Sequence, residues 1–256
     1  MKPVSLLIAT LLVAPLSLSA VAPTAQAGED AAALGAKILE HADSKAAAYP
    51  NQSYTASMTI FKDGNATKTM VFDMKMKDLE KQYINFTKPG DVAGMKVLMT
   101  DADTIYIYTP EFKKVRRVAA HTQNQGFLGS EFAPEDMKLA KLASKFNAEV
   151  VGKKGSETTL ILTPKREDVS SFAKLEIVID ATVGGITKIR YIDGSGNAVR
   201  EQVRRDWKSA GKAKIPTKIT MKNLKTGDET VIEMTNIDVK TEISDDIFSR
   251  RTLLRG

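Results

Sequence analysis

The chain has 256 residues, no cysteine and a formal charge of +6 at pH 7. Without cysteine it forms no disulfide bond and offers no thiolate nucleophile or metal ligand, so the fold depends on its hydrophobic core. The charge excess is moderate, because 37 basic residues stand against 31 acidic ones. Such an excess favours anionic lipid headgroups or an acidic protein surface as binding counterparts, and the export pattern described next argues against nucleic acid.

The N-terminal segment has the pattern of a secretory signal peptide. A lysine stands at the second position, an apolar run covers residues 4–18, and Ala25-Gln26-Ala27 is a small-x-small cleavage signal. A membrane anchor is disfavoured, because Pro15 interrupts the run and a span requires roughly twenty unbroken apolar residues. The pattern predicts that residues 1–27 are removed. Residues 28–256 then form a single soluble periplasmic domain.

A helix is expected at the start of the mature domain. Asp30 is a suitable N-cap, and Leu34, Ile38 and Ala42 recur at helical spacing. These three apolar residues are therefore expected to face the core.

Beyond residue 50 the apolar residues recur with a period of two, which is typical of half-buried strands. The clearest case places Met70, Phe72, Met74 and Met76 on one face, and Met58 lies on a matching face of the preceding strand. Flexible methionine suits either an ordinary core or a wall that adapts to a ligand. The predicted strands, which indicate a barrel or sandwich, cover residues 54–60, 70–77, 82–87, 95–99, 104–108, 113–118, 148–153, 158–163, 174–180, 187–193, 198–207, 215–222 and 230–239.

A further helix is predicted over residues 134–146, where a proline and two acidic residues favour a helix start. Its polar face carries Lys138, Lys141 and Lys145. A solvated surface explains most such faces, but a basic amphipathic helix also suits anionic headgroups or a transporter. A short helix is expected over residues 245–250, after Ser244.

The most specific motifs lie between residues 86 and 137. The chain reads FTKPGD, then GMKVL, then YIYTPEFKKVRRV, then GFLGSEFAPEDM. These are a Pro-Gly turn, two short strands, a basic strand and a loop with large apolar residues that solvent does not favour. The ordered series resembles the outer-membrane lipoprotein-sorting family, periplasmic proteins similar to the lipoprotein carrier of the Lol pathway.

This resemblance implies a mainly β (α+β) fold, in which an incomplete antiparallel β-barrel of about eleven strands wraps around a few helices. It also implies an apolar cavity for acyl chains, and a wide barrel leaves interior room for one. The residues expected to line this cavity are Met58, Met70, Phe72, Met74 and Met76, and those expected to form its lid are Phe127, Leu128 and Phe132.

Basic residues near the lid are candidates for contact with a partner or a lipid headgroup. Arg116 and Arg117 point to opposite sides of one predicted strand, so one of them is expected at the cavity mouth. A solvated face is the alternative. Together with Lys138, Lys141 and Lys145, these two arginines complete the set of predicted contacts.

Patterns of catalysis are absent from the sequence. The two histidines, His41 and His121, have no converging metal ligands beside them. Ser130 lies in Gly-Ser-Glu and not in a nucleophile elbow. Gly194 and Gly196 mark a hairpin turn, because no helix follows them. The sequence therefore predicts a protein that is not an enzyme and has no cofactor or metal.

Two functions remain open from the sequence. The first is a monomeric periplasmic carrier that binds the acyl chains of a lipid or lipoprotein. It would receive them from an inner-membrane transporter and pass them towards an outer-membrane acceptor. The second is a non-transporting module that senses envelope lipid and binds a membrane protein. A dedicated partner-binding domain would favour the second, and the sequence shows none.

Overall fold

The computed structural model describes residues 24–255, except residues 102–103, 120–121, 139–140 and 212. Most of the predicted signal peptide lies outside the described residues, as does His121. Residues 25–27, the predicted cleavage signal, belong to the start of the first helix, α1 (Thr24–Ala46).

Thirteen antiparallel strands form one sheet in the order β6-β5-β4-β3-β2-β1-β13-β12-β11-β10-β9-β8-β7. The edge strands β6 and β7 follow each other in the chain but do not pair, so the sheet is open. This confirms the predicted incomplete antiparallel barrel, with more strands than the eleven expected. The strands are β1 (Asn51–Lys62), β2 (Asn65–Lys77), β3 (Lys81–Lys88), β4 (Lys96–Met99), β5 (Ile105–Thr109), β6 (Lys114–Arg117), β7 (Phe146–Lys154), β8 (Glu157–Pro164), β9 (Lys174–Asp180), β10 (Gly185–Ile192), β11 (Ala198–Ala210), β12 (Ala213–Asn223) and β13 (Glu229–Asp238).

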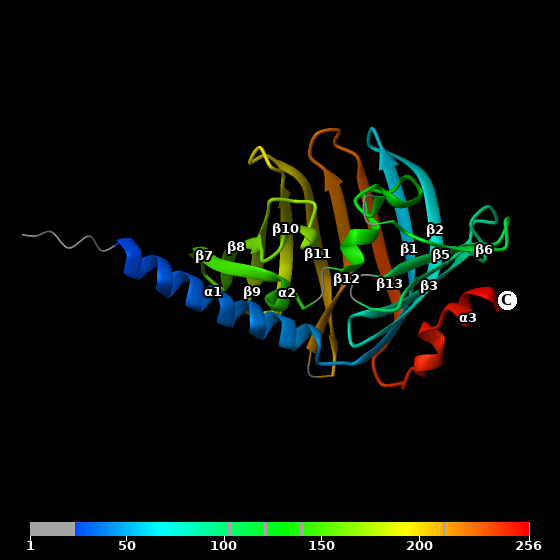
Figure 1. Ribbon diagram of the computed structural model, residues 1–256, viewed down its shortest axis with the longest axis horizontal. Helices are drawn as coiled ribbons and strands as arrows, with labels where there is room; N and C mark the ends of the chain where they lie inside the picture. The colour runs from blue at the N-terminus through cyan, green and yellow to red at the C-terminus, as the bar shows by residue number, and fades with distance from the viewer. Residues whose placement is uncertain (1–23, 102–103, 120–121, 139–140, 212, 256) are drawn as a thin grey trace, which may run out of the picture.

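Helices and short 3-10 turns cover parts of this curved sheet (Figure 1). Helix α1 lies across the strands near β7, and α3 lies at the other side of the molecule, near β3 and β5. The described helices are α1, α2 (Leu142–Lys145) and α3 (Arg250–Leu254), with 3-10 turns at Phe127–Gly129, Pro134–Lys138, Glu167–Val169 and Asp245–Phe248.

The predicted alternation holds along β1 and β2. Met70, Phe72 and Met74 are buried, whereas Asp73 and Lys75 between and beside them are exposed. A two-residue turn joins the strands, and its residues Asp63 and Gly64 both have positive φ, 49° and 77°, as a type I′ hairpin requires.

Helix α1 begins upstream of Asp30 and buries part of the predicted stripe, because Ala42 is buried and Ile38 packs against the core. Leu39 and Ala42 are buried, but Leu34 is 51% exposed, so its predicted core position was wrong. The reason lies at Gly35, which packs on the β7 backbone. A Cβ at Gly35 would lie 2.6 Å from the carbonyl oxygen of Ala148, so the glycine side of the helix faces the sheet and Leu34 turns away.

The helix predicted over residues 134–146 is not continuous. Residues 134–138 form a 3-10 turn, Lys141 has a left-handed φ of 52°, and α2 has only four residues. Phe146 already belongs to β7. The buried Leu142 and Phe146 fix this segment by packing into the core, so tertiary contacts override the helical spacing.

Two hydrophobic cores lie along the sheet. One joins α1 and α2 to β7–β10 and includes Leu39, Leu142 and Tyr191. The other joins β1–β5 and β13 and includes Met70 and Phe72. A smaller cluster packs the C-terminal segment on β4 through Leu98, Phe248 and Leu253. At the start of that segment the Ser244 hydroxyl accepts the Asp246 N–H at 3.3 Å, which supports the predicted helix start.

Candidate ligand-binding cavity

A cavity of about 860 Å³ lies between α1 and the central strands of the sheet. That volume falls within the roughly 300–1,000 Å³ of small-molecule sites. Its walls come from α1, from α2 with the segment before it, from β1–β3, and from β8–β13. Apolar side chains from opposite walls include Ile38, Met74, Met76, Ile219 and Met234. Residues from the N-terminal and C-terminal parts of the chain therefore line one partly open, mostly apolar cavity.

Polar and charged side chains also line this cavity beside the apolar ones. Tyr54, Gln52 and Gln82 reach it from β1 and β3. Burial raises the pKa of Tyr54 to about 12, so its hydroxyl is neutral at physiological pH. The Gln82 amide donates to the carbonyl oxygens of Leu79 and Met137, at 3.2 and 2.9 Å. The Gln82 amide is therefore already hydrogen-bonded within the protein.

The structure separates the predicted cavity residues into two groups. Met74 and Met76 line the cavity. Met58, Met70 and Phe72 instead pack in the core around β1–β5, each at most 5% exposed. The two groups share one face of the sheet but lie at different positions along the strands.

The predicted lid residues pack on the core that contains Met58, Met70 and Phe72. We call residues 126–137 the lid segment. Phe127, Leu128 and Phe132 all pack against the core around β1–β5, and the ring centroids of Phe127 and Phe86 are 6.1 Å apart. At the other end of the segment, Asp136 and Met137 line the cavity. The lid segment thus covers the core with its apolar side chains and reaches the cavity with its last residues.

Charged groups hold the lid segment to the sheet. Arg200 donates to Asp136 Oδ2 at 2.6 Å and to the Glu131 carbonyl oxygen at 2.9 Å. Its guanidinium also lies 4.7 Å from the Tyr191 ring centroid. Both charged side chains are nearly buried, at 11% and 6% exposure. Burial raises the pKa of the neighbouring Glu135 carboxyl.

Glu131 provides the second attachment of the lid segment. Its carboxylate lies 2.8 Å from Lys62 Nζ, and its backbone N–H donates to Thr230 Oγ1 at 2.9 Å. The Asn223 amide donates to the same carboxylate at 3.3 Å. These contacts join the lid segment to β1, β12 and β13. These attachments of the lid segment were not predicted from the sequence, although the acidic residues of SEFAPED were a visible signal of them.

The pairing of β12 with β13 stops part-way along the strands. It covers five register pairs, from Lys222–Glu229 to Lys218–Glu233. Beyond it, Pro216 of β12 has no N–H to donate. Asn236 in β13 has a positive φ of 52° and lies at a register shift with β1, which is typical of a strand bulge. Asp206 in β11 also has a positive φ, 55°, but keeps its register with β12. The strands therefore diverge at this end of the sheet.

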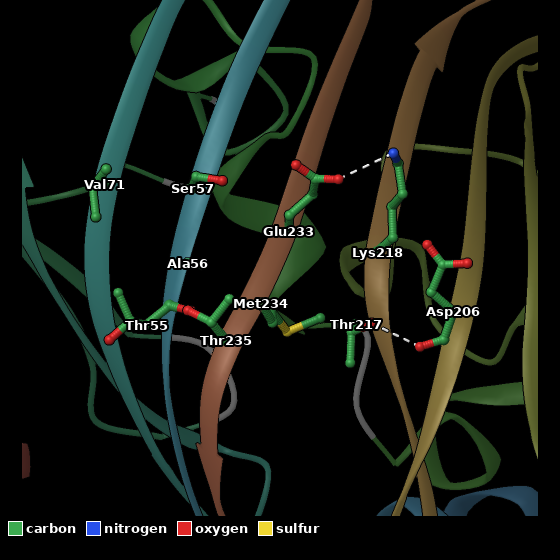
Figure 2. Close-up of a pocket in the computed structure, with 10 residues that line it drawn as sticks. All are labelled: Thr55, Ala56, Ser57, Val71, Asp206, Thr217, Lys218, Glu233, Met234 and Thr235. Atoms are coloured by element: carbon green, nitrogen blue, oxygen red, sulfur yellow. Dashed lines mark hydrogen bonds and ion pairs between the residues drawn. The ribbon is translucent and has the colours of Figure 1, made fainter.

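A second cavity of about 380 Å³ lies at this divergence (Figure 2). Its lining is more polar, with Ser57, Glu233 and Lys218 on the side facing the viewer, and Glu233 and Lys218 form an ion pair at 3.1 Å. Met234 lines both cavities. The larger cavity is the candidate ligand site, because its walls are apolar and it lies on the face that α1 covers.

Neither a metal site nor a membrane helix is found in the described part of the chain. No group of three or more His, Asp or Glu side chains there has a metal-binding arrangement. Among the helices of residues 24–255, none combines the length and apolarity needed to cross a bilayer.

A protein-family model with the description "Uncharacterized protein" matches residues 78–255, well over half of the chain. The chain belongs to that family. The region that the family model matches contains the lid segment and β3–β13, whereas α1, β1 and β2 precede it. A comparison with curated proteins found no match.

Solved structures with the same fold include three bacterial proteins. A predicted outer membrane lipoprotein-sorting protein domain from Vibrio parahaemolyticus has 21% identity and a TM-score of 0.80, over 88% of this chain and 100% of its own. A DUF1329 family protein from Desulfovibrio piger has 19% identity and a TM-score of 0.80, over 87% and 99%. A LolA superfamily protein from Nitrosomonas europaea has 18% identity and a TM-score of 0.71, over 85% and 99%. The resemblance predicted from residues 86–137 is confirmed at the level of the fold.

The basic residues predicted as partner contacts do not form one surface. Arg116 and Arg117 are exposed on the edge strand β6. Lys141 pairs with Glu80 at 2.9 Å and lines the cavity. Lys145 lies near Asp43, whose pKa is raised by burial and lowered in part by this lysine. The side chain of Lys138 lies outside the described residues. Their role in partner contact stays a prediction.

Proposed function

We propose that this protein is a periplasmic carrier that holds the acyl chains of a lipid or lipoprotein in the cavity beneath α1. The observation that carries the proposal is the apolar cavity of about 860 Å³, in a fold that this chain shares with a lipoprotein-sorting domain. Burial of an acyl chain there contributes about 0.8 kcal/mol per methylene. One long chain is therefore bound strongly and can still be released.

Release requires an acceptor that offers the cargo a more favourable apolar site, because in this proposal the carrier has no energy source of its own. The open sheet and the lid segment suit such a transfer. An inner-membrane donor and an outer-membrane acceptor are the partners that a carrier requires. This function needs no catalytic group or cofactor.

The first experiment is native mass spectrometry of the protein purified from its own periplasm, with identification of the lipids released. An acylated species bound in a defined ratio is expected. A protein that is empty and also fails to bind a fluorescent fatty-acyl probe would contradict the carrier. That outcome would favour a module that binds a membrane protein without carrying cargo.

Variants of Met74 and Met76 test whether the acyl chain occupies this cavity. Met74→Glu and Met76→Glu each place a charge against the apolar ligand, so probe binding should fall by at least about tenfold. Lys75→Glu, on the opposite face of β2, is the matched control and should bind normally. Met76 is less buried than Met74, so its variant should fold even if Met74→Glu does not. Normal binding by a folded Met76→Glu protein would place the acyl chain elsewhere.

A further inference from the structure

Arg204 is a charged residue in the wall of the apolar cavity. It lies on β11 opposite Ile219 of β12, which also lines the cavity. At Asp206 the backbone has a left-handed φ of 55°, and the alternation of side chains changes there although the register with β12 is kept. The Asp206 carboxylate turns to the face drawn towards the viewer in Figure 2, and the Thr217 hydroxyl donates to the Asp206 carbonyl oxygen at 2.7 Å. Trp207 consequently lines the cavity as well.

Few of the N–H groups of the Arg204 guanidinium are hydrogen-bonded within the described part of the protein. Its Nε donates to Gln202 Oε1 at 2.8 Å. Within the described residues, no carboxylate lies within ion-pair distance of it, and its terminal Nη groups have no hydrogen-bond partner. Those nitrogens are also not among the fully buried polar atoms that lack a partner, so they remain accessible in the cavity wall. Burial lowers the pKa of Arg204, but a guanidinium stays protonated at physiological pH.

Arg200, four residues earlier on the same strand, shows the contrast. It pairs with Asp136 at 2.6 Å and bonds the Glu131 carbonyl oxygen. The fold therefore supplies a carboxylate to one cavity-side arginine of β11 and leaves the other without one. A partly desolvated cation without a counterion is unfavourable, and an arriving anion removes that cost.

Other charged groups around the cavity do not replace this role. Lys141 pairs with Glu80, and Lys214 donates to the Thr182 carbonyl oxygen at 3.0 Å. The carboxylates of Asp136 and Asp43 already bind Arg200 and the Ala143 N–H. Lys37 and Lys45 of α1 also line the cavity, but both are exposed to solvent. Among the described residues, Arg204 is thus a partly buried cation without a carboxylate partner, placed to receive an anionic group whose chain lies on the apolar wall.

We infer that Arg204 recognises the anionic head of the cargo, so that the cavity selects anionic amphiphiles over neutral ones of equal chain length. The two Nη groups form a fork that matches a carboxylate or a phosphate. The acyl chain then lies along Met74, Met76 and Met234. This inference rests on the proposed function, because it assumes that the cavity holds acyl chains.

The test compares palmitate, methyl palmitate and a palmitoyl lysophosphatidic acid, each displacing a fluorescent acyl probe below its micelle concentration. Wild-type protein should bind palmitate or the lysophosphatidate at least about tenfold more tightly than methyl palmitate. The tighter of the two anions identifies carboxylate or phosphate as the preferred head.

Arg204→Met should abolish this preference while its affinity for methyl palmitate stays within about threefold of wild type. Arg204→Lys keeps the charge without the fork and should retain part of the preference. Arg205→Met, at an exposed neighbouring position, is the control and should behave as wild type. A thermal melt followed by circular dichroism establishes that each variant is folded. If Arg204→Met does not fold, the intermediate preference expected of Arg204→Lys decides the test.

The outcomes separate the two proposals. Wild-type protein that binds methyl palmitate and the anions equally overturns the role of Arg204 and leaves the carrier standing. An anion preference that survives Arg204→Met also overturns it. Failure of the wild type to bind any of the three ligands removes the proposed function, and the inference about Arg204 with it.

Discussion

At the scale of single residues, Asp43 joins α1 to α2, because its carboxylate accepts the Ala143 N–H at 2.7 Å. Burial is the largest influence on this group and raises its pKa above the ordinary 3.8. A raised carboxyl pKa means that the folded state binds the proton more tightly than the unfolded state. Ionisation of Asp43 therefore costs stability as the pH rises from 3.8 through the raised value.

Asp43→Asn keeps an acceptor for Ala143 and removes that cost. The variant should gain stability relative to wild type as the pH rises through this window, and the difference should vanish below the ordinary value of 3.8. Urea unfolding across the acidic range measures it. Asp30→Asn, exposed on the same helix, is the control. A constant difference at every pH would show that Asp43 acts through packing alone.

Trp207 provides a built-in reporter, because it is the sole tryptophan of the chain and lines the cavity. A Cβ at Gly185 would lie 2.9 Å from its ring, so glycine there lets the indole pack closely. Binding of palmitate should replace water near the ring and shift its emission to shorter wavelength. The same titration with Met76→Glu should give no shift. Unchanged emission on saturating wild-type protein would place the ligand away from Trp207.

At the scale of elements, the two attachments of the lid segment should differ in energy. Arg200→Met leaves the nearly buried Asp136 without its partner, which costs about 3–5 kcal/mol. Lys62→Met removes the ion pairs to Glu131 and Asp228, whose lysine is 38% exposed, and the loss of each costs within about 1 kcal/mol. Chemical denaturation of both variants measures the contrast. Equal losses would mean that the Arg200 pair does not hold the lid segment.

The strands were predictable from the sequence because alternation is a local signal. The run from Met70 to Met76 shows its buried face without any knowledge of the neighbours. The segment 134–146 was not predictable in the same way. Its apolar spacing fits a helix, but Lys141 is left-handed and Phe146 joins the sheet. Contacts with distant parts of the chain decide that outcome.

The candidate site was predictable only in part. Alternation correctly gave the face that carries Met74 and Met76, but position along the strand decides which residues reach a cavity. Met58 and Met70 share the face and are core. Arg204 was visible as a basic residue, yet its surroundings depend on β12 and on the left-handed backbone at Asp206. No sequence period reports such a backbone conformation.

At the scale of the whole molecule, the exposed arginines of β6 give one edge of the sheet a positive charge. If this edge meets a membrane, Arg116→Glu with Arg117→Glu should weaken binding to vesicles rich in phosphatidylglycerol, by about 1 kcal/mol per removed arginine. The loss should shrink as salt is added. Vesicle co-sedimentation measures it.

The opposite edge supplies the matched control. Lys153→Glu with Lys154→Glu changes the charge equally on exposed positions of β7. Equal loss of vesicle binding in both pairs of variants would mean that the net charge of the protein, and not the β6 edge, determines this binding. Binding of palmitate should be unchanged in either pair, because none of these four residues lines the cavity.

The short pairing of β12 with β13 has a mechanical consequence for the whole sheet. The five register pairs there compare with ten between β11 and β12, and separate hydrophobic cores lie on the two sides. The two cores are therefore joined across a partly paired seam, which the lid segment bridges through Glu131. Under the proposed carrier function, a change of angle at this seam would accommodate cargoes of different bulk without repacking either core.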